Sequence, residues 1–211
     1  MRRVLCPLNV REMRITATCL EEMPGAYVPE YPFIPISYGF KLAREPWELQ
    51  EFWKLRERTF CGEQKIFTGS DRDEHDANMI PIIAVACEMG TPDRVAGVVR
   101  IDEREPGLWW GSRLAVDPDF RRIRNVGYGP FPNDQPRFNG LGALGAGLIY
   151  KAVSTANRLG CQTFLATVQE QNARFFSRLH WRTLDSIDLH GRSHYIMRAE
   201  LEYYPPCKEV F

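Results

Sequence analysis

The chain has 211 residues, of which 44% are apolar and 12% aromatic, and this is enough to bury the core of one domain with additional segments. Its 27 Lys and Arg residues are balanced by 27 Asp and Glu residues, so the formal net charge is zero. This balance excludes a global positive field that would hold nucleic acid or an anionic membrane. Any anion-binding site must therefore be local.

Targeting segments and cysteines restrict the cellular context that we expect. The N-terminal segment lacks the apolar stretch of a signal peptide, and no later run approaches the ~18 apolar residues of a membrane span. The six cysteines are scattered without a CxxC pair, which favours reduced thiols over a disulfide framework. The sequence predicts a cytoplasmic protein without membrane contact.

Residues 1–35 form a proline-rich N-terminal arm. Prolines at positions 24, 29, 32 and 35 exclude a regular helix there. The aromatic residues Tyr27, Tyr31 and Phe33 predict that the arm packs either on its own domain or on a second subunit of a homodimer.

A regular pattern begins at Ile36. A strand at 37–43 precedes a helix within 44–60, which has Pro46 in its first turn. After a polar loop, three antiparallel strands joined by turns are predicted at 80–89, 93–102 and 107–117.

Residues 123–139 are rich in Gly, Pro and Asn and form an inserted loop that is long for a compact domain. Further elements are predicted after it: a helix at 143–159, a strand at 161–168, a short helix at 172–179, and strands at 183–190 and 193–202. The chain is therefore an α+β domain over 36–204, around a mixed, mostly antiparallel sheet of six or seven strands, with a tail at 205–211.

Four glycines occupy eight positions, 140 to 147, at the start of the predicted helix in RFNGLGALGAGLIYKAV. The unpaired amides of a helix N-terminus bind phosphate oxygens, and glycine lets a ligand approach them closely. The alternative is a helix that needs small residues for close packing. The nearby Arg121 and Arg122 could add charge-assisted contacts to a diphosphate.

The order of these segments resembles the acyl-coenzyme-A-binding core of the GNAT superfamily of N-acetyltransferases. The resemblance runs from Ser37 to Glu202 and rests on LAVDPDFRR, the glycine-rich loop, RLGC before FLATV, and NARFFSRLHW. In the first half, LRERTFCGEQKIF and DRDEHD resemble an acetyltransferase branch encoded beside nitrilase genes, with more distant similarity to acyl-homoserine lactone synthases. The resemblance implies a GNAT fold, acetyl-CoA as donor and a small amine or amino-acid-like acceptor.

The resemblance also assigns residues to the coenzyme. The family's phosphate loop matches RFNGLG literally, whereas the helix register, counted from Leu148 and Ile149, makes Gly145 its second glycine and is the stronger argument. The implied diphosphate-binding residues are Arg121, Arg122, Gly140, Leu141, Gly142, Ala143, Leu144, Gly145 and Ala146. The implied partners of the pantetheine arm are the backbone of Leu114, Ala115 and Val116, and the side chain of Asn172, which could instead cap a helix.

Direct acyl transfer needs a neutral amine, an oxyanion donor and an acid for the leaving thiolate, but no covalent nucleophile and no metal. Phe176 stands where the family commonly has a tyrosine acid, and its ring has no proton to give. Glu63 is the candidate base, with a solvated glutamate as the alternative. Tyr195 is the candidate substitute acid, with a packed aromatic as the alternative.

Other polar residues have plainer expectations. The loop that contains Asp73, Glu74, His75 and Asp76 either binds a cationic acceptor or is solvated. The pair His190 and His194 lies across a turn with no third ligand at a sensible spacing, so no metal site is predicted. Two further expectations concern strand residues: Trp109 and Trp110 point to opposite faces, and Arg100 and Arg113 pair with Asp102 or Glu103.

Two functions compete with the acetyltransferase hypothesis. The loss of the tyrosine at Phe176 and the insertion at 123–139 are compatible with an acyl-CoA-binding or partner module without catalysis. The DRDEHD loop and the RLAV segment are compatible with a signal synthase that joins an acyl group to a methionine-derived amine.

Overall fold

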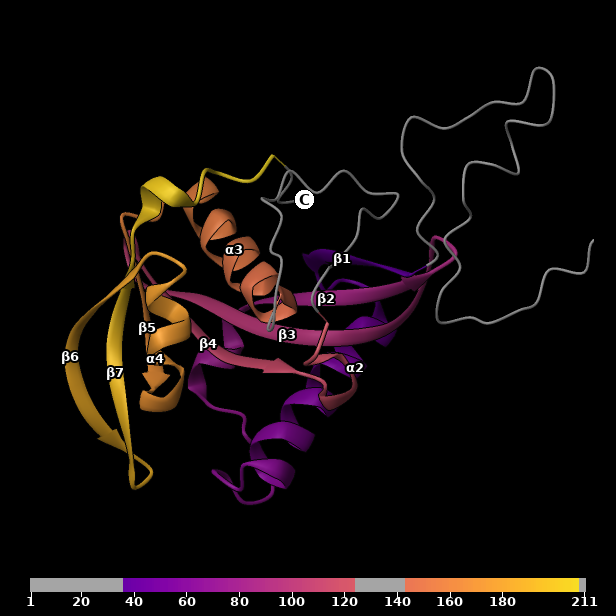
Figure 1. The fold of residues 1–211 in the computed structure, drawn as a ribbon, viewed down its shortest axis with the longest axis horizontal. Coiled ribbons are helices and arrows are strands. Elements are labelled where there is room, and N and C mark those ends of the chain that lie inside the picture. The colour runs from indigo at the N-terminus through magenta and orange to yellow at the C-terminus, as the bar shows by residue number, and fades with distance from the viewer. Residues whose placement is uncertain (1–35, 124–142, 209–211) are drawn as a thin grey trace, which may run out of the picture.

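The computed structural model describes residues 36–123 and 143–208. The predicted arm and almost all of the 123–139 insertion lie outside these residues, so packing of the arm on a second subunit stays a prediction. The described part contains one seven-stranded sheet in the order β1-β2-β3-β4-β5-β7-β6 (Figure 1). The strands are β1 (Ile36–Leu42), β2 (Ile80–Glu88), β3 (Thr91–Glu105), β4 (Leu108–Val116), β5 (Thr163–Gln169), β6 (Trp181–Leu189) and β7 (Arg192–Ala199).

Within the described residues, three α-helices cover this sheet: α2 (Pro46–Glu57), α3 (Ala143–Arg158) and α4 (Glu170–Ser177). All neighbouring strands are antiparallel except β4 and β5, which are parallel. The predicted α+β class and the mostly antiparallel sheet are therefore confirmed.

Alternate residues of β2 belong to two separate cores, because successive side chains of a strand point to opposite faces. Ile82 and Ala84 pack in the core beneath α3, whereas Ile83 and Val85 pack in the core beneath α2. Figure 1 shows α3 and α2 on opposite sides of strands β2 to β4. The helix α4 adds Phe176 to the core of the α3 face.

Local sequence explains where α2 begins and how it ends. Pro46 occupies its first turn, and Glu45 and Glu48 form a capping box. The helix then continues as a π-helix, Arg58–Glu63, in which the Gln64 amide donates to the Thr59 carbonyl at 2.8 Å. π-Helical turns are frequent at functional sites, and this one carries Phe60.

Two irregularities in β4 open the middle of the sheet. Arg113 and Leu114 together face the single residue Val99 of β3, and Arg113 has a φ of 56°, so β4 contains a bulge. On its other side, β4 pairs with β5 only as far as Gly111 and Ala166. The second halves of these parallel strands are therefore not hydrogen-bonded to each other.

The ordered chain continues past the expected domain end at 204. The Tyr204 hydroxyl donates to the Leu179 carbonyl and accepts from the Trp181 indole N–H at 3.0 Å. The Cys207 amide donates to the Ser154 carbonyl of α3 at 3.1 Å. The first part of the predicted tail is therefore attached to α3.

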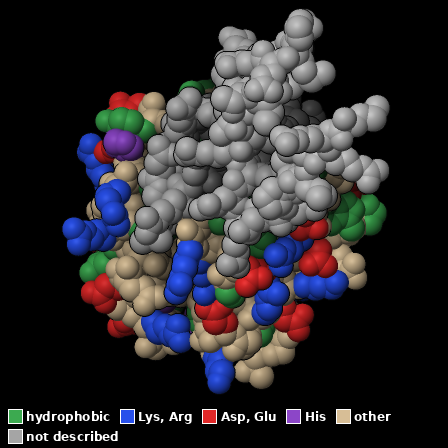
Figure 2. Space-filling model, turned by 45° about the vertical axis from the view of Figure 1, so that its right-hand side comes forward, with side chains coloured by type: hydrophobic (Ala, Val, Ile, Leu, Met, Phe, Trp, Pro, Cys, Tyr) green, Lys and Arg blue, Asp and Glu red, His purple; other side chains and the backbone are tan. Residues whose placement is uncertain are grey.

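Surface charges follow the balanced composition. On the face that Figure 2 displays, basic and acidic side chains lie next to one another over the described residues. Within 36–123 and 143–208, none of the helices combines the length and the apolar content that crossing a membrane would need.

Candidate active site

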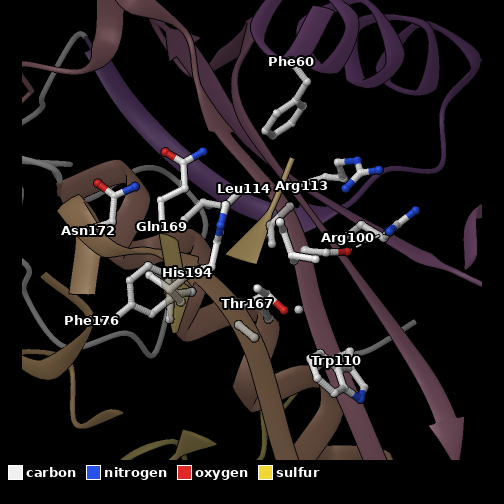
Figure 3. A pocket seen from close by; sticks show the side chains of 18 of the residues that line it. Phe60, Arg100, Trp110, Arg113, Leu114, Thr167, Gln169, Asn172, Phe176 and His194 are labelled. Carbon is white, nitrogen blue, oxygen red and sulfur yellow. Dashed lines mark hydrogen bonds between the residues drawn. The ribbon is translucent and has the colours of Figure 1, made fainter. Parts of the chain in front are cut away.

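A cavity of about 340 Å³ lies where β4 and β5 separate (Figure 3). Its lining includes Gly111 to Leu114 of β4 and Ala166 to Gln169 of β5. It also includes side chains from both faces of the sheet, such as Val153 of α3 on one face and Arg100 of β3 on the other. The cavity therefore passes through the sheet at the gap between the two strands.

On the α3 face the cavity wall is apolar. Ile149 and Val153 of α3 lie there with Phe164 of β5. Phe176 of α4 is buried against Trp181, with ring centroids 5.1 Å apart in an edge-to-face arrangement. Phe176, which stands where the family commonly has a tyrosine acid, is thus a packed hydrocarbon ring.

On the opposite face the wall combines aromatic rings and guanidinium groups. The Arg113 guanidinium lies over Phe67 at 4.5 Å, and that of Arg104 lies over Trp110 at 4.5 Å. Trp109, in contrast, is buried in the core of the α3 face. The prediction that the two tryptophans point to opposite faces is confirmed.

Six charged side chains form one ionic cluster next to this wall. Its members are three arginines and three aspartates: Arg56, Arg100, Arg113, Asp71, Asp73 and Asp76. Arg56 Nε contacts Asp71 Oδ2 at 2.8 Å, and its Nη1 contacts Asp76 Oδ1 at 2.6 Å. Both Arg56 and Arg100 are buried, with exposed fractions of 0% and 1%. The cluster is neutral, so each buried charge has a partner of the opposite sign.

The cluster changes the expectation for the DRDEHD loop. Asp73 accepts from Arg100, from Arg113 and from the His75 amide, so it is neither solvated nor free for a cationic acceptor. Burial alone would raise the pKa of Asp76, but hydrogen bonds from Arg56 and Arg100 hold this pKa well below its usual range. Both expectations were wrong for Asp73 and Asp76, whereas Glu74, whose side chain is 83% exposed, is solvated as the second alternative expected.

The expected partners of two arginines also need correction. Arg100 Nε donates to Ser112 Oγ at 2.8 Å, and the rest of its guanidinium contacts the aspartates of the loop. Arg113 also pairs with that loop rather than with Asp102 or Glu103. Asp102 and Glu103 were expected as partners because they lie on strands next to the arginines. The loop that contains Asp71, Asp73 and Asp76 instead folds over the sheet and supplies the carboxylates.

The β6–β7 hairpin closes the cavity from the side opposite the ionic cluster. Gln64 Oε1 accepts from the Gln169 side chain at 3.1 Å, and the Gln64 carbonyl accepts from Arg192 Nη2 at 3.0 Å. The rings of Phe67 and His190 meet edge to face, 5.0 Å apart. The segment after the π-helix thus contacts both β5 and the β6–β7 hairpin, and all three border the same cavity.

The residues assigned to the pantetheine arm lie at this gap. Leu114 lines the cavity, with Ala115 and Val116 completing β4 beyond its pairing with β5. Asn172 also lines the cavity. Because α4 begins at Glu170, Asn172 is inside the helix and is not its cap.

Only part of the assigned diphosphate loop can be located. Gly140, Leu141 and Gly142 lie outside the described residues, and α3 begins at Ala143. Among the residues of its first turn, the side chains of Leu144 and Ala146 are buried in the core. Their assignment to the coenzyme thus concerns the backbone of the first helical turn and stays a prediction.

The two helical glycines differ in what surrounds them. A Cβ at Gly147 would lie 2.2 Å from Cζ of Phe40, so this glycine allows α3 to pack on β1. A Cβ at Gly145 would be 3.8 Å from Phe175, which is an ordinary contact distance. Packing therefore explains Gly147 but does not require glycine at Gly145.

Glu63 and Arg121 were assigned separate roles, but the structure pairs them with each other. Arg121 Nη1 and Nη2 contact the two Glu63 carboxylate oxygens at 2.6 and 2.5 Å. The hydrogen bonds from Arg121 lower the pKa of Glu63, which makes it a weaker base. Glu63 is not part of the cavity wall, and Arg122 is exposed. The roles of Glu63, Arg121 and Arg122 stay predictions. The ion pair between Glu63 and Arg121 disfavours the roles assigned to these two residues.

Tyr195 faces away from the polar side of the cavity. It packs against the core of the α3 face, and its hydroxyl is 3.4 Å from Glu170 Oε1. The neighbouring residue of β7, His194, points to the other face and lines the cavity. The HxxxH spacing singled out His194, but only as a metal ligand, because the sequence does not say which strand face meets a cavity.

Comparisons with solved structures find the same architecture. An acyl-CoA N-acyltransferase from Pseudomonas aeruginosa is 19% identical, with a TM-score of 0.55 over 78% of this chain and 99% of that one. A Bacillus subtilis acetyltransferase in complex with CoA is 14% identical, with a TM-score of 0.52 over 77% and 98%. The chain has the GNAT fold.

A third neighbour is BjaI, a CoA-dependent acyl-homoserine lactone synthase whose structure contains SAM and isopentyl-CoA. It is 14% identical, with a TM-score of 0.51 over 71% of this chain and 74% of that one. No protein-family model matches the sequence, and no curated protein does either. The likeness is therefore one of fold, and the function has to be argued from the cavity.

Proposed function

We propose that this chain is an acyl-CoA-dependent N-acyltransferase, and specifically an N-acetyltransferase that acts on a small amine. The observation that carries the proposal is one continuous cavity, lined by described residues, that crosses the sheet between β4 and β5. A donor that enters from the α3 face can present its acyl group to an acceptor on the other face. The polypeptide then only has to hold the two molecules in contact.

The donor side suits acyl-CoA, with acetyl-CoA as the proposed donor. Beyond Gly111, the β5-facing side of β4 lacks a strand partner among the described residues. The amides of a pantetheine arm can bond to such an edge as an added strand would. The first turn of α3, with Gly145 in it, supplies backbone amides for the diphosphate.

The acceptor side suits a small amine that carries a carboxylate, as an amino acid does. Arg104 is stacked on Trp110, and its Nε donates to Asp102 at 2.8 Å. Among the described residues, its two Nη groups have no hydrogen-bond partner. Because a guanidinium binds a carboxylate through two such N–H groups, Arg104 could orient an amino-acid-like acceptor.

Direct transfer is the favoured route because neither hydroxyl of the described lining is hydrogen-bonded to a general base. Ser112 Oγ accepts from Arg100 Nε, and Thr167 Oγ1 has no hydrogen bond to a carboxylate or a histidine among the described residues. No cysteine belongs to the described lining. An amine that attacks the thioester itself needs no acylated enzyme.

The donor assignment can be tested with two exposed polar residues of α4. Asn172 lines the cavity, whereas Ser177 does not. We expect Asn172→Trp to weaken acetyl-CoA binding in calorimetric titration and Ser177→Trp to leave it unchanged. Equal effects of the two substitutions, or no acyl-CoA binding by the unaltered protein, would contradict the donor site.

The acceptor assignment can be tested with paired amines that differ only in a carboxylate. In a thiol-release assay, Arg104→Gln should raise KM for amino acids and leave KM for the corresponding decarboxylated amines unchanged. A KM increase of the same size for both members of a pair would mean that Arg104 does not bind the carboxylate.

Two other functions remain candidates, each with its own observation. The packed ring of Phe176 favours an acyl-CoA-binding module without catalysis, which predicts binding but no thiol release with any amine. The likeness to BjaI favours a signal synthase. That function predicts thiol release only with a methionine-derived amine and a lactone among the products.

A further inference from the structure

The proposed transfer needs a group that moves a proton from the amine to the departing sulfur, and Glu63, Phe176 and Tyr195 do not supply it. Phe176 has no ionisable proton. Glu63 is held by Arg121 outside the cavity wall, and Tyr195 faces the α3 side. The polar half of the cavity holds the other ionisable side chains of the described lining.

His194 is the buried histidine of this cavity. It is 8% exposed and lies on β7 opposite Gln169, the last residue of β5 (Figure 3). The other two histidines in the wall, His75 and His190, are more exposed, and His75 is near the carboxylates of Glu74 and Asp102. His194 has no carboxylate partner among the described residues.

The hydrogen bond of His194 determines which ring nitrogen is available. Nδ1 lies 2.8 Å from the Arg192 carbonyl oxygen, and a carbonyl only accepts hydrogen bonds. Nδ1 therefore carries a proton, and in the neutral ring the lone pair is on Nε2. The bond also fixes the ring orientation, because Arg192 is part of the same strand and its side chain is bonded to the Gln64 carbonyl.

We propose that His194 is the proton-transfer residue of this site. The inference rests on the proposed N-acyltransferase function. As the neutral amine attacks the thioester carbon and the C–N bond forms, Nε2 accepts the proton that leaves the nitrogen. As the C–S bond breaks, the same ring returns this proton to the thiolate. Amide and free thiol are the products, and His194 ends in its starting state.

The first experiment separates chemistry from binding. His194→Asn keeps an amide donor near the position of Nδ1 but has no basic nitrogen in place of Nε2. We expect kcat for thiol release to fall by about 10²–10⁴-fold, the usual contribution of a positioned acid–base group, with acetyl-CoA affinity unchanged. His180→Asn is the matched control, because His180 is exposed, stacks on Tyr203 at 3.6 Å and has a φ of 61° that asparagine tolerates.

A second experiment distinguishes a chemical role from a structural one. In His194→Ala, added imidazole should restore thiol release in proportion to its concentration, whereas the unaltered enzyme should not respond. If His194→Asn also lost donor binding, its kcat would not separate chemistry from binding, and the imidazole experiment would decide instead. Absence of rescue by imidazole would overturn the inference.

The outcomes for the two proposals differ. Full turnover by His194→Asn would overturn the role of His194 and leave the N-acyltransferase function standing. Absence of turnover by the unaltered protein with every donor and amine would overturn the function itself, and the role of His194 with it.

Discussion

The two faces of the sheet bury different chemistry at the same depth. On the α3 face, fully buried side chains such as Leu148, Val153 and Phe164 are hydrocarbon. On the α2 face, the largest fully buried side chains are Arg56 and Arg100. One face is held by apolar contact, and part of the other by ion pairs.

This difference separates the parts of the molecule that make the fold from those that shape the site. Apolar packing tolerates substitutions that conserve volume, so many apolar side chains would hold α3 on the sheet. The segment between the π-helix and β2 has only the short 3₁₀-helix Glu74–Ala77, and Asp71, Asp73 and Asp76 tie it to arginines. Hydrogen bonds with defined geometry thus position the polar wall of the cavity.

The largest expected effect comes from breaking the ionic cluster. Arg56→Ala would leave Asp71 with Arg113 and Asp76 with Arg100, and the buried cluster would keep one uncompensated negative charge, so we expect it to lower the free energy of unfolding by about 3–5 kcal/mol. Arg58→Ala, two residues later, should cost less than about 1 kcal/mol, because the Arg58 side chain is 60% exposed. Urea unfolding measures both, and equal costs would contradict the structural role of the cluster.

A smaller effect tests the apolar face. Gly147→Ala would place a methyl group against the Phe40 ring and should cost about 1–3 kcal/mol. Gly145→Ala has room and should stabilise the helix by about 0.5–1 kcal/mol. Thermal unfolding checks the order. If Gly145→Ala also weakened acetyl-CoA binding, glycine at this position would have a ligand rather than a packing reason.

Acid should weaken the ionic face before the apolar one. The pKa of Asp76 is lowered in the folded state, so its contribution to stability is complete above the unfolded value of about 4 and is lost as the pH falls below it. Asp76→Asn should flatten this loss in urea unfolding between about pH 5 and pH 2. Glu74→Gln, at a side chain that is 83% exposed, should leave the slope unchanged. If Asp76→Asn had the same pH dependence of the free energy of unfolding as the unaltered protein, the lowered pKa of Asp76 would be contradicted.

The smallest effect concerns thiol reactivity on the α3 face. Burial raises the pKa of Cys161 to about 11, so at pH 8 this thiol is protonated and shielded. Cys161 should react with an alkylating reagent only when the protein unfolds, which peptide mass spectrometry can follow. The partly exposed Cys61 is the internal reference, and faster labelling of Cys161 than of Cys61 would contradict the packing of this face.

Sequence reasoning found the elements because their periodicity is local. The strands, the α-helices and the packing role of Gly147 all follow from patterns within about twenty residues. It found fewer of the site's contacts. The pairing of Glu63 with Arg121 joins residues 58 positions apart, and the cluster joins Arg56 to residues up to 57 positions away. No local pattern specifies which arginine meets which aspartate.

By itself, the sequence determined that the chain forms an α+β sheet domain, because hydrophobic period and turn residues act over short distances. Only the tertiary structure decided that β4 and β5 part after Gly111 and that the space between them opens to both faces. It also decided that His194, rather than Tyr195, turns toward that space. These outcomes depend on strand register and on a bulge at Arg113, and a shift of one residue would exchange the two side chains.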